Sequence, residues 1–438
     1  MFTVLSGRQS LGGGFLASSL FFLYVLYLFM ALILPLAAKV VAGLLLLLGL
    51  VLAFQSVLRG GGAFDEGELL LVWAFTAFSI ISIISFFYWP HSRESQMRLE
   101  DYGTFLLLLP LFLVLRQYYF NLTYVVVLLA LVACVLGVVS IIQYVSMKYF
   151  GQYVLTGEGR MSRDWLRPSG GVNPMRYGAI SLIFVCFALN ALLLIRDKAA
   201  WLKVLLVAAV LMALIACLLA QVRGSWLALP VLLLAYGIYL YKAGHPRFML
   251  GVLLAGVLLL GVASQTQVVQ SRVAQAVSNV NAYLGGNGQT SIGARLDMFK
   301  AAGILISQSP IWGHGLNSYS PKASEIREAT PGMSREVGMW NNPHNEILQV
   351  MVEKGVIGLI TLILLFAAPA YMFIKALYDI RVEVKYYAMN GLAILIVYAV
   401  AGQSVALFEH DVFNHFFALM ILFFASQISV IQRQGVGR

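Results

Sequence analysis

The sequence predicts an all-α polytopic integral membrane protein, and two features of its composition carry this prediction. Of its 438 residues, 61% are apolar and only 11% are charged, whereas soluble domains carry about 25% charged residues. The apolar residues also come in runs of about 20 with few charges, which is the length that an α-helix needs to cross a hydrocarbon core of about 30 Å. This composition excludes a soluble enzyme and a nucleic-acid-binding protein.

About twelve segments have this length and composition. The first begins near Phe15, where neither a short apolar core nor a cleavage site indicates a signal peptide, so we expect a retained helix. In order along the chain, the predicted helices cover residues 15–36, 39–58, 67–89, 102–116, 121–147, 174–195, 200–220, 224–242, 247–264, 356–377, 384–407 and 412–431. An even number of crossings places both termini on the same side of the membrane.

Lysine and arginine in the short connections predict which side that is. Twelve of them fall on the side of the N-terminus: Arg8, Arg59, Arg116, Arg196, Lys198, Lys242, Arg247, Lys375, Arg381, Lys385, Arg433 and Arg438. The opposite connection at 409–411 carries two acids, and the one at 90–101 balances two arginines with three acids. Because cytoplasmic loops carry the excess of positive charge, we expect both termini in the cytoplasm.

Two long connections lie on the predicted outer side, at about 148–173 and 265–345. In the second, apolar residues recur at helical spacing over 273–284 and again over 292–306, so we expect a small helical outer domain that rests partly on the bilayer. The chain would then have three parts, namely nine membrane helices in 1–264, the large outer loop at 265–345, and three membrane helices in 346–438.

These outer connections are rich in arginine, which includes Arg160, Arg163, Arg167 and Arg176 in the first and Arg272, Arg295, Arg327 and Arg335 in the second. Contact with anionic lipid head groups is one explanation. Binding of a substrate that carries phosphate is the other, because the planar guanidinium forms bidentate, charge-assisted hydrogen bonds with phosphate oxygens. Arg223 is the strongest single candidate, since a charge wedged between two apolar helices without a nearby acid in sequence is costly and usually functional.

A histidine stands at the outer mouth of a predicted membrane helix, in the segment WNNPHNEILQ at 340–349. Pro343 suits a first helical turn, and Asn342 before it is a good cap. His344 would then lie in that first turn, where the partial positive charge of the helix N-terminus lowers the pKa of an imidazole. A neutral histidine can act as a general base, with Glu346 or Glu353 nearby; a purely structural capping histidine is the alternative.

No metal site or cofactor is predicted. The segment EHDVFNH at 409–415 does not place two histidines on one helical face, as a metal site on a helix would need. The three cysteines lie inside apolar runs without paired spacing, so we assign them no redox or metal role.

The sequence around His344 resembles the signature of the O-antigen ligase and polymerase superfamily. The matching residues are His344, Asn345, Leu348, Glu353, Gly355 and Gly358. The segment QVRGSWLAL around Arg223 resembles a second family motif, and ARLDMFKAAGILISQSPIWGHGLNSY, which begins one residue before Arg295, resembles a third. The resemblance covers about residues 205–375, and at Met298 the family commonly has an aromatic residue.

The resemblance implies a membrane glycosyltransferase of the GT-C-like fold class that transfers a glycan from undecaprenyl pyrophosphate at the outer, periplasmic face of a Gram-negative inner membrane. In the ligase branch the acceptor is a sugar hydroxyl of lipid A–core, and the reaction is inverting, metal-independent and free of cofactors. His344 would be the general base, with Arg223 and Arg295 on the pyrophosphate. Further contacts with pyrophosphate or acceptor are expected from Arg160, Arg163, Arg167, Asn345 and Glu353.

Three alternatives stay open at this point. An O-antigen polymerase would extend the glycan on a second lipid-linked chain, and a protein O-oligosaccharyltransferase would use a protein hydroxyl. The length and the single large outer loop favour the ligase, as does the lack of an added C-terminal domain. A lipid or polysaccharide transporter would show internal repeats and ionisable residues at mid-membrane, neither of which the sequence indicates.

Overall fold

The computed structural model describes residues 2–4, 11–58, 64–88, 93–151, 167–195, 199–244 and 267–436, with a few positions between 246 and 265. Within these residues the protein is helical, apart from two three-residue strands, β1 (Phe2–Val4) and β2 (Tyr118–Phe120), which pair antiparallel. Nine of the described helical segments are long and apolar enough to cross a membrane. The predicted all-α polytopic membrane fold is therefore confirmed.

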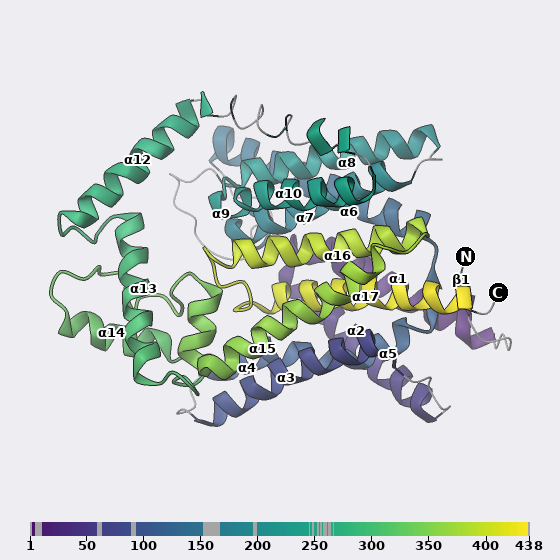
Figure 1. Cartoon of the computed structure of the whole chain (residues 1–438), viewed down its shortest axis with the longest axis horizontal. Coiled ribbons are helices and arrows are strands. Elements are labelled where there is room, and N and C mark those ends of the chain that lie inside the picture. The colour runs from purple at the N-terminus through teal and green to yellow at the C-terminus, as the bar shows by residue number, and fades with distance from the viewer. Residues whose placement is uncertain are drawn as a thin grey trace.

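The helical bundle consists of α1 (Leu11–Met30), α2 (Pro35–Leu58), α3 (Glu66–Tyr88), α4 (Arg93–Leu107), α5 (Leu109–Leu115), α6 (Leu122–Val145) with a π-helical extension at Ser146–Phe150, α7 (Pro174–Leu194), α8 (Ala200–Leu219), α9 (Arg223–Trp226), α10 (Ala228–Lys242), α15 (Glu346–Ala376), α16 (Val382–Ala401) and α17 (Asp411–Val436). Three further helices, α12 (Gln267–Leu284), α13 (Ser291–Gln308) and α14 (Tyr319–Ala329), project from one end of this bundle (Figure 1).

Helix α17 forms the centre of the bundle and is almost completely buried. Helices α16, α4, α5 and α15 pack around it. At its outer end Phe417 stacks edge-on with Phe408, at 5.2 Å between ring centroids, and contacts the ring of Tyr398 at 5.0 Å. Such aromatic pairs add to the stability gained from burial alone, so they fix the start of α17 and the loop before it.

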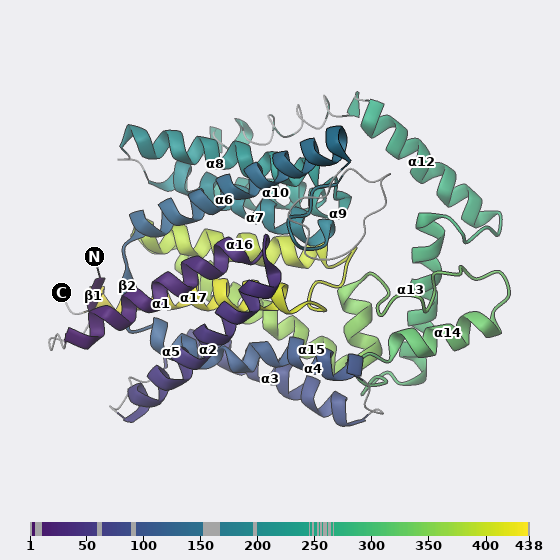
Figure 2. The same ribbon diagram turned by 180° about the vertical axis from the view of Figure 1, so that it is seen from behind.

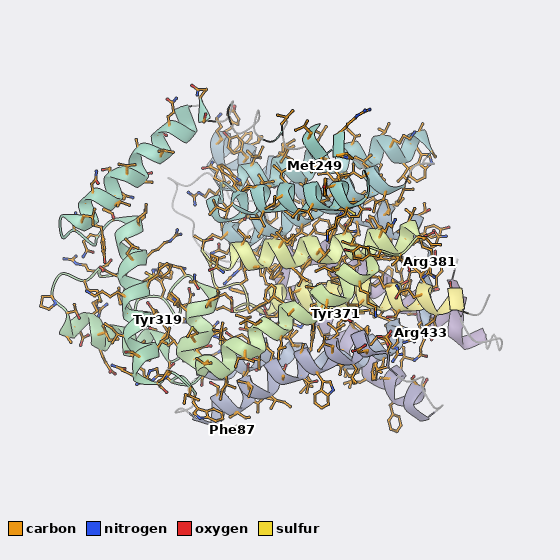
Figure 3. All side chains as sticks on the ribbon, in the orientation of Figure 1. Phe87, Met249, Tyr319, Tyr371, Arg381 and Arg433 are labelled. Carbon is orange, nitrogen blue, oxygen red and sulfur yellow. The ribbon has the colours of Figure 1, made fainter. Side chains whose placement is uncertain are left out.

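Both termini lie at the end of the bundle opposite to α12–α14 (Figures 1 and 2). At the terminal end the buried carboxylate of Glu68 accepts hydrogen bonds from Arg433, at 2.6 Å, and forms an ion pair with Arg116, at 2.8 Å. Arg433 and Arg381 mark this end in Figure 3, and Tyr319 marks the other. The candidate site residues are found at the end that carries α12–α14.

Two predicted membrane helices need comment. The predicted single helix at 102–116 is wrong, because the chain forms α4 from Arg93 and then the short α5, and the two together cross the bundle (Figure 1). Pro110 lies in the first turn of α5, and because proline has no N–H it cannot continue α4. The predicted helix at 247–264 lies mostly outside the described residues.

The large outer connection contains the two helices that its apolar spacing predicts. Helix α13 begins at a threonine cap, where Thr290 Oγ1 accepts a hydrogen bond from the Gly293 amide, and it packs against α15. Helix α12 contacts α13 and leaves its apolar face exposed, at Val273, Val277, Val280 and Leu284. We expect this face to rest on the bilayer.

Candidate active site at the head of helix α15

The backbone at His344 differs from the prediction that this residue lies in the first turn of a helix. Helix α15 begins at Glu346, and its cap is Asn345, whose Oδ1 accepts a hydrogen bond from the Leu348 amide at 3.0 Å. Asn342 does not cap the helix; its Oδ1 accepts a hydrogen bond from the His344 amide at 2.7 Å. The chain therefore turns twice on asparagine side chains before the helix starts, and His344 lies on the turn between them.

His344 has a φ of 56°, in the left-handed region. Non-glycine residues there cost about 1–3 kcal/mol and cluster at functional sites. Hydrogen bonds from the next two residues hold the strained backbone in this conformation. Asn345 Nδ2 donates to the Gln403 carbonyl at 3.3 Å, and the Glu346 amide donates to the Gly402 carbonyl at 2.7 Å. The loop between α16 and α17 thus holds the histidine turn in place.

The imidazole of His344 is half-buried, and its hydrogen-bonding capacity is only partly used. Its Nδ1 atom is buried and has no hydrogen-bond partner among the described residues, and its ring lies 5.9 Å from the ring of Trp340. Burial lowers the pKa of His344, the positive charge of Arg295 lowers it further, and Arg176 adds to this against the opposing charge of Glu336. The imidazole is therefore neutral at pH 7 and has a free nitrogen to accept a proton.

Only some of the predicted arginines lie among the residues that the structure describes. Arg295, on α13, is near enough to His344 for its charge to lower the pKa of the imidazole. Arg167 is half-buried just before α7, whereas Arg160 and Arg163 lie outside the described residues. Arg223 opens α9, and its side chain is also outside what the structure describes.

The backbone next to Arg223 nevertheless approaches the His344 turn. A Cβ atom at Gly224 would lie 2.0 Å from Ser404 Oγ and 3.1 Å from its Cβ, so α9 packs closely against the α16–α17 loop. That loop is the one that bonds Asn345 through Gln403. The heads of α9 and α15 therefore meet on the same loop.

Glu353 is fully buried, and protein groups occupy its carboxylate. It accepts hydrogen bonds from the Asn317 amide at 2.8 Å and from Gln349 Nε2 at 2.6 Å, and its Oε1 lies 3.7 Å from Arg98 Nε. Asn345 is likewise used as a cap. The sequence predicted that both residues contact substrate. In this structure their side chains instead form hydrogen bonds within the protein that shape the site.

Helix α15 is broken at Gly355, which has a φ of 62° and a ψ of −159°. The segment 310–315 fills the gap, since the amides of His314 and Gly315 donate to the Val352 and Glu353 carbonyls at 2.7 and 2.9 Å. In the other direction the Val356 amide donates to the Pro310 carbonyl at 2.8 Å. This pairing satisfies the backbone groups that the kink frees and joins the Gly313–Gly315 segment to Gly355.

We predict that Gly355→Ala lowers stability by about 1–3 kcal/mol, because this φ, ψ region is almost confined to glycine and a Cβ there would lie 2.2 Å from the Ile311 carbonyl oxygen. Thermal unfolding of the purified protein in detergent measures the loss. Gly303→Ala on α13 is the matched control, since a Cβ at Gly303 meets nothing within 4 Å and alanine favours a helix interior. Equal melting temperatures for the two variants would contradict the role of the kink.

A chain of polar side chains that the sequence did not reveal connects this kink with His344. Asn342 Nδ2 donates to Glu409 Oε2, Glu409 Oε1 accepts from Arg98 Nη2 at 2.7 Å, and Arg98 lies beside Glu353. The carboxylates of Glu409 and Glu353 thus balance the charge of the buried Arg98 guanidinium. Arg98 and Glu409 are 311 positions apart, so only the fold could show that they pair.

Comparisons with known proteins find similarity in the part of the chain that holds this site. Residues 207–363 match the family model described as O-antigen ligase. Over this segment the chain is similar to O-antigen ligases. The matched segment contains Arg223, Arg295, His344 and the kink at Gly355, and the resemblance predicted from these motifs is confirmed.

Two curated relatives are similar over part of their length. An O-antigen ligase of Escherichia coli K12 is 27% identical over 160 residues, which cover 36% of this chain and 38% of that protein. An uncharacterized protein of Haemophilus influenzae is 28% identical over 222 residues, which cover 49% of this chain and 55% of that protein. The matches thus span about half or less of the length of these relatives.

Proposed function

We propose that this protein is an O-antigen ligase that transfers a glycan from undecaprenyl pyrophosphate to a sugar hydroxyl of lipid A–core. The observation that carries the proposal is His344, a neutral imidazole with an unpartnered buried Nδ1, held beside Arg295 within the segment that matches the family. We place this end of the bundle in the periplasm of a Gram-negative cell and both termini in the cytoplasm, in agreement with the positive-inside rule.

The proposed reaction is a single displacement. His344 accepts the proton of the acceptor hydroxyl, the hydroxyl oxygen forms a bond with the anomeric carbon of the glycan, and the bond from that carbon to the pyrophosphate oxygen breaks. Undecaprenyl pyrophosphate leaves with its electron pair, so the anomeric configuration inverts. Positive charges fixed beside the leaving group stabilise it in the transition state, and Arg223 and Arg295 are the residues to which we assign this role.

The surroundings of the site suit a lipid-linked donor. Ile311, Trp312, Met339 and Trp340 are exposed next to the His344 turn and the kink. Tryptophan is enriched where a protein meets the boundary of a bilayer. A donor whose lipid tail stays in the membrane could therefore present its pyrophosphate at this level.

The test supplies purified protein in detergent with undecaprenyl-pyrophosphate-linked glycan and one of three acceptors. Glycosylated lipid A–core is the product that the proposal predicts. Longer lipid-linked chains from the donor alone would instead make the protein a polymerase, and glycosylation of an added pilin would make it a protein O-oligosaccharyltransferase. No covalent product with any acceptor would contradict a transferase and favour a transporter.

The pH dependence follows from the charges around His344. Because its pKa lies below the ordinary value of about 6.5, the rate should be constant at neutral pH and fall only as the pH drops through the lowered pKa. Arg295→Gln removes one cause of that shift, so the acid limb of its kcat/KM profile should move to higher pH. Lys300→Gln, an exposed residue on the same helix, should leave the limb in place; an unshifted limb in Arg295→Gln would contradict the assignment.

A further inference from the structure

A cavity of about 530 Å³ opens among the heads of α2, α4, α7 and α17. Asn341 lies in its wall, three positions before His344, and so does Glu409, which accepts a hydrogen bond from Asn342. Its volume falls within the range of about 300–1,000 Å³ that is typical of small-molecule sites. The cavity is therefore a separate space that adjoins the His344 turn.

Arg176, at the start of α7, lines this cavity and is only 7% exposed. One of its nitrogens, Nη2, donates weakly to the Ala406 carbonyl at 3.4 Å, and its guanidinium carbon lies 5.6 Å from the centroid of the Phe413 ring. Its Nε has no hydrogen-bond partner, and no carboxylate of the described residues lies within ion-pair distance. A buried cation without a direct partner is costly unless a ligand completes it.

Arg98 lines the same cavity and shows the contrast. Its guanidinium forms an ion pair with Glu409 at 2.7 Å, so protein groups already engage it. The charge of Arg176, by comparison, reaches both His344 and His410, because it lowers the pKa of each imidazole after burial has done so. Arg176 thus presents to the cavity a guanidinium that protein groups engage only in part.

The chemistry of the walls indicates the class of ligand. Carboxylates outnumber cations among the lining residues, which disfavours a bare phosphate, and few apolar side chains are present, which disfavours a lipid chain. Among the described residues no three of His, Cys, Asp and Glu are grouped to hold a metal ion. The walls carry both hydrogen-bond donors and acceptors, such as Arg176, Asp101 and Asn341, which can pair with the hydroxyl groups of a sugar.

We infer that this cavity binds the terminal sugar of the acceptor, and that Arg176 donates hydrogen bonds to it from the cavity wall. The inference rests on the proposed function, because the bound sugar would present its hydroxyl to His344 at the adjoining turn. Asp101 lies in the same wall, and its carboxylate can accept a hydrogen bond from a sugar hydroxyl.

The test measures the KM for lipid A–core and the KM for the lipid-linked donor separately. Arg176→Gln and the isosteric Asp101→Asn should each raise the acceptor KM about tenfold, as loss of a hydrogen bond to a charged group predicts, and leave the donor KM within about twofold. Arg93→Gln, an exposed arginine on α4 outside the cavity, should change neither. Thermal unfolding shows which variants are folded. If Arg176→Gln does not fold, Asp101→Asn alone provides the test.

The possible outcomes separate the two proposals. A higher donor KM, or weaker binding of undecaprenyl pyrophosphate, would overturn the inference and make the cavity a donor site; unchanged KM values in a folded Asp101→Asn variant would overturn it as well. If wild type transfers no glycan, the proposed function fails. Titration of the protein with lipid-free core oligosaccharide then tests the cavity independently of transfer. Binding that is weaker in Asp101→Asn than in wild type supports a sugar site, and absence of binding overturns the inference.

Discussion

Replacement of His344 with alanine is expected to abolish glycan transfer, with a fall in kcat/KM of about 10²–10⁴-fold, the range that general base catalysis supplies. The physical reason is that the acceptor hydroxyl must lose its proton as it attacks, and the imidazole Nδ1 at this turn has no hydrogen-bond partner among the described residues. The rate of transfer from the lipid-linked donor at saturating lipid A–core measures the loss.

A second variant separates loss of the base from loss of the fold. His344 has a positive φ, which asparagine tolerates better than alanine, so His344→Asn should fold like wild type and be equally inactive. His314→Asn is the matched control, because His314 Nε2 lies 2.8 Å from the Leu305 carbonyl oxygen, where it contributes to the fold rather than to the histidine turn. This variant should lose stability and keep its chemistry. Undiminished transfer by His344→Ala would refute the assignment of the base.

Arg223→Ala is expected to have the second largest effect, a loss of about 10²–10³-fold in donor use. The charge of the departing pyrophosphate grows in the transition state, and a planar guanidinium can donate two parallel hydrogen bonds to it. Arg223→Lys keeps the charge without that geometry, so we expect it to retain more activity than Arg223→Ala and less than wild type. Initial rates at varied donor concentration measure both variants.

The comparison of lysine with alanine is informative in either direction. Equal activity of the two variants would mean that the planar group is unnecessary at Arg223, and wild-type activity of both would remove Arg223 from the site. Arg93→Lys and Arg93→Ala, on an exposed position of α4, provide the control for a general change in surface charge. Both control variants should transfer glycan at the wild-type rate.

The membrane helices could be predicted from the sequence because long apolar runs have few other stable arrangements in a bilayer. Helix α7, for example, was predicted at 174–195 and runs over Pro174–Leu194. The prediction failed at 102–116, where hydropathy hid the break at Pro110 and the polar start of α4 at Arg93. Composition measures how apolar a segment is, and it does not show where the backbone hydrogen bonds stop.

The site could be predicted only as far as local residue types reach. His344, Arg223 and Arg295 stood out as polar residues at the ends of apolar segments, but the cap was assigned to Asn342 although Asn345 forms it. Glu353 was expected to contact substrate, and in the structure it organises a buried network with Arg98 and Gln349. Contacts between α4, α15 and α17 depend on how the helices pack, which no single segment encodes.

Transfer by purified, EDTA-treated protein from undecaprenyl-pyrophosphate-linked glycan to lipid A–core tests the central claim most directly, with the anomeric configuration of the new bond read by NMR. The proposed single displacement, with His344 as base and arginines on the leaving group, predicts that product forms in EDTA and that its configuration is inverted. Product that forms only after a divalent metal is restored, or a retained configuration, would contradict it.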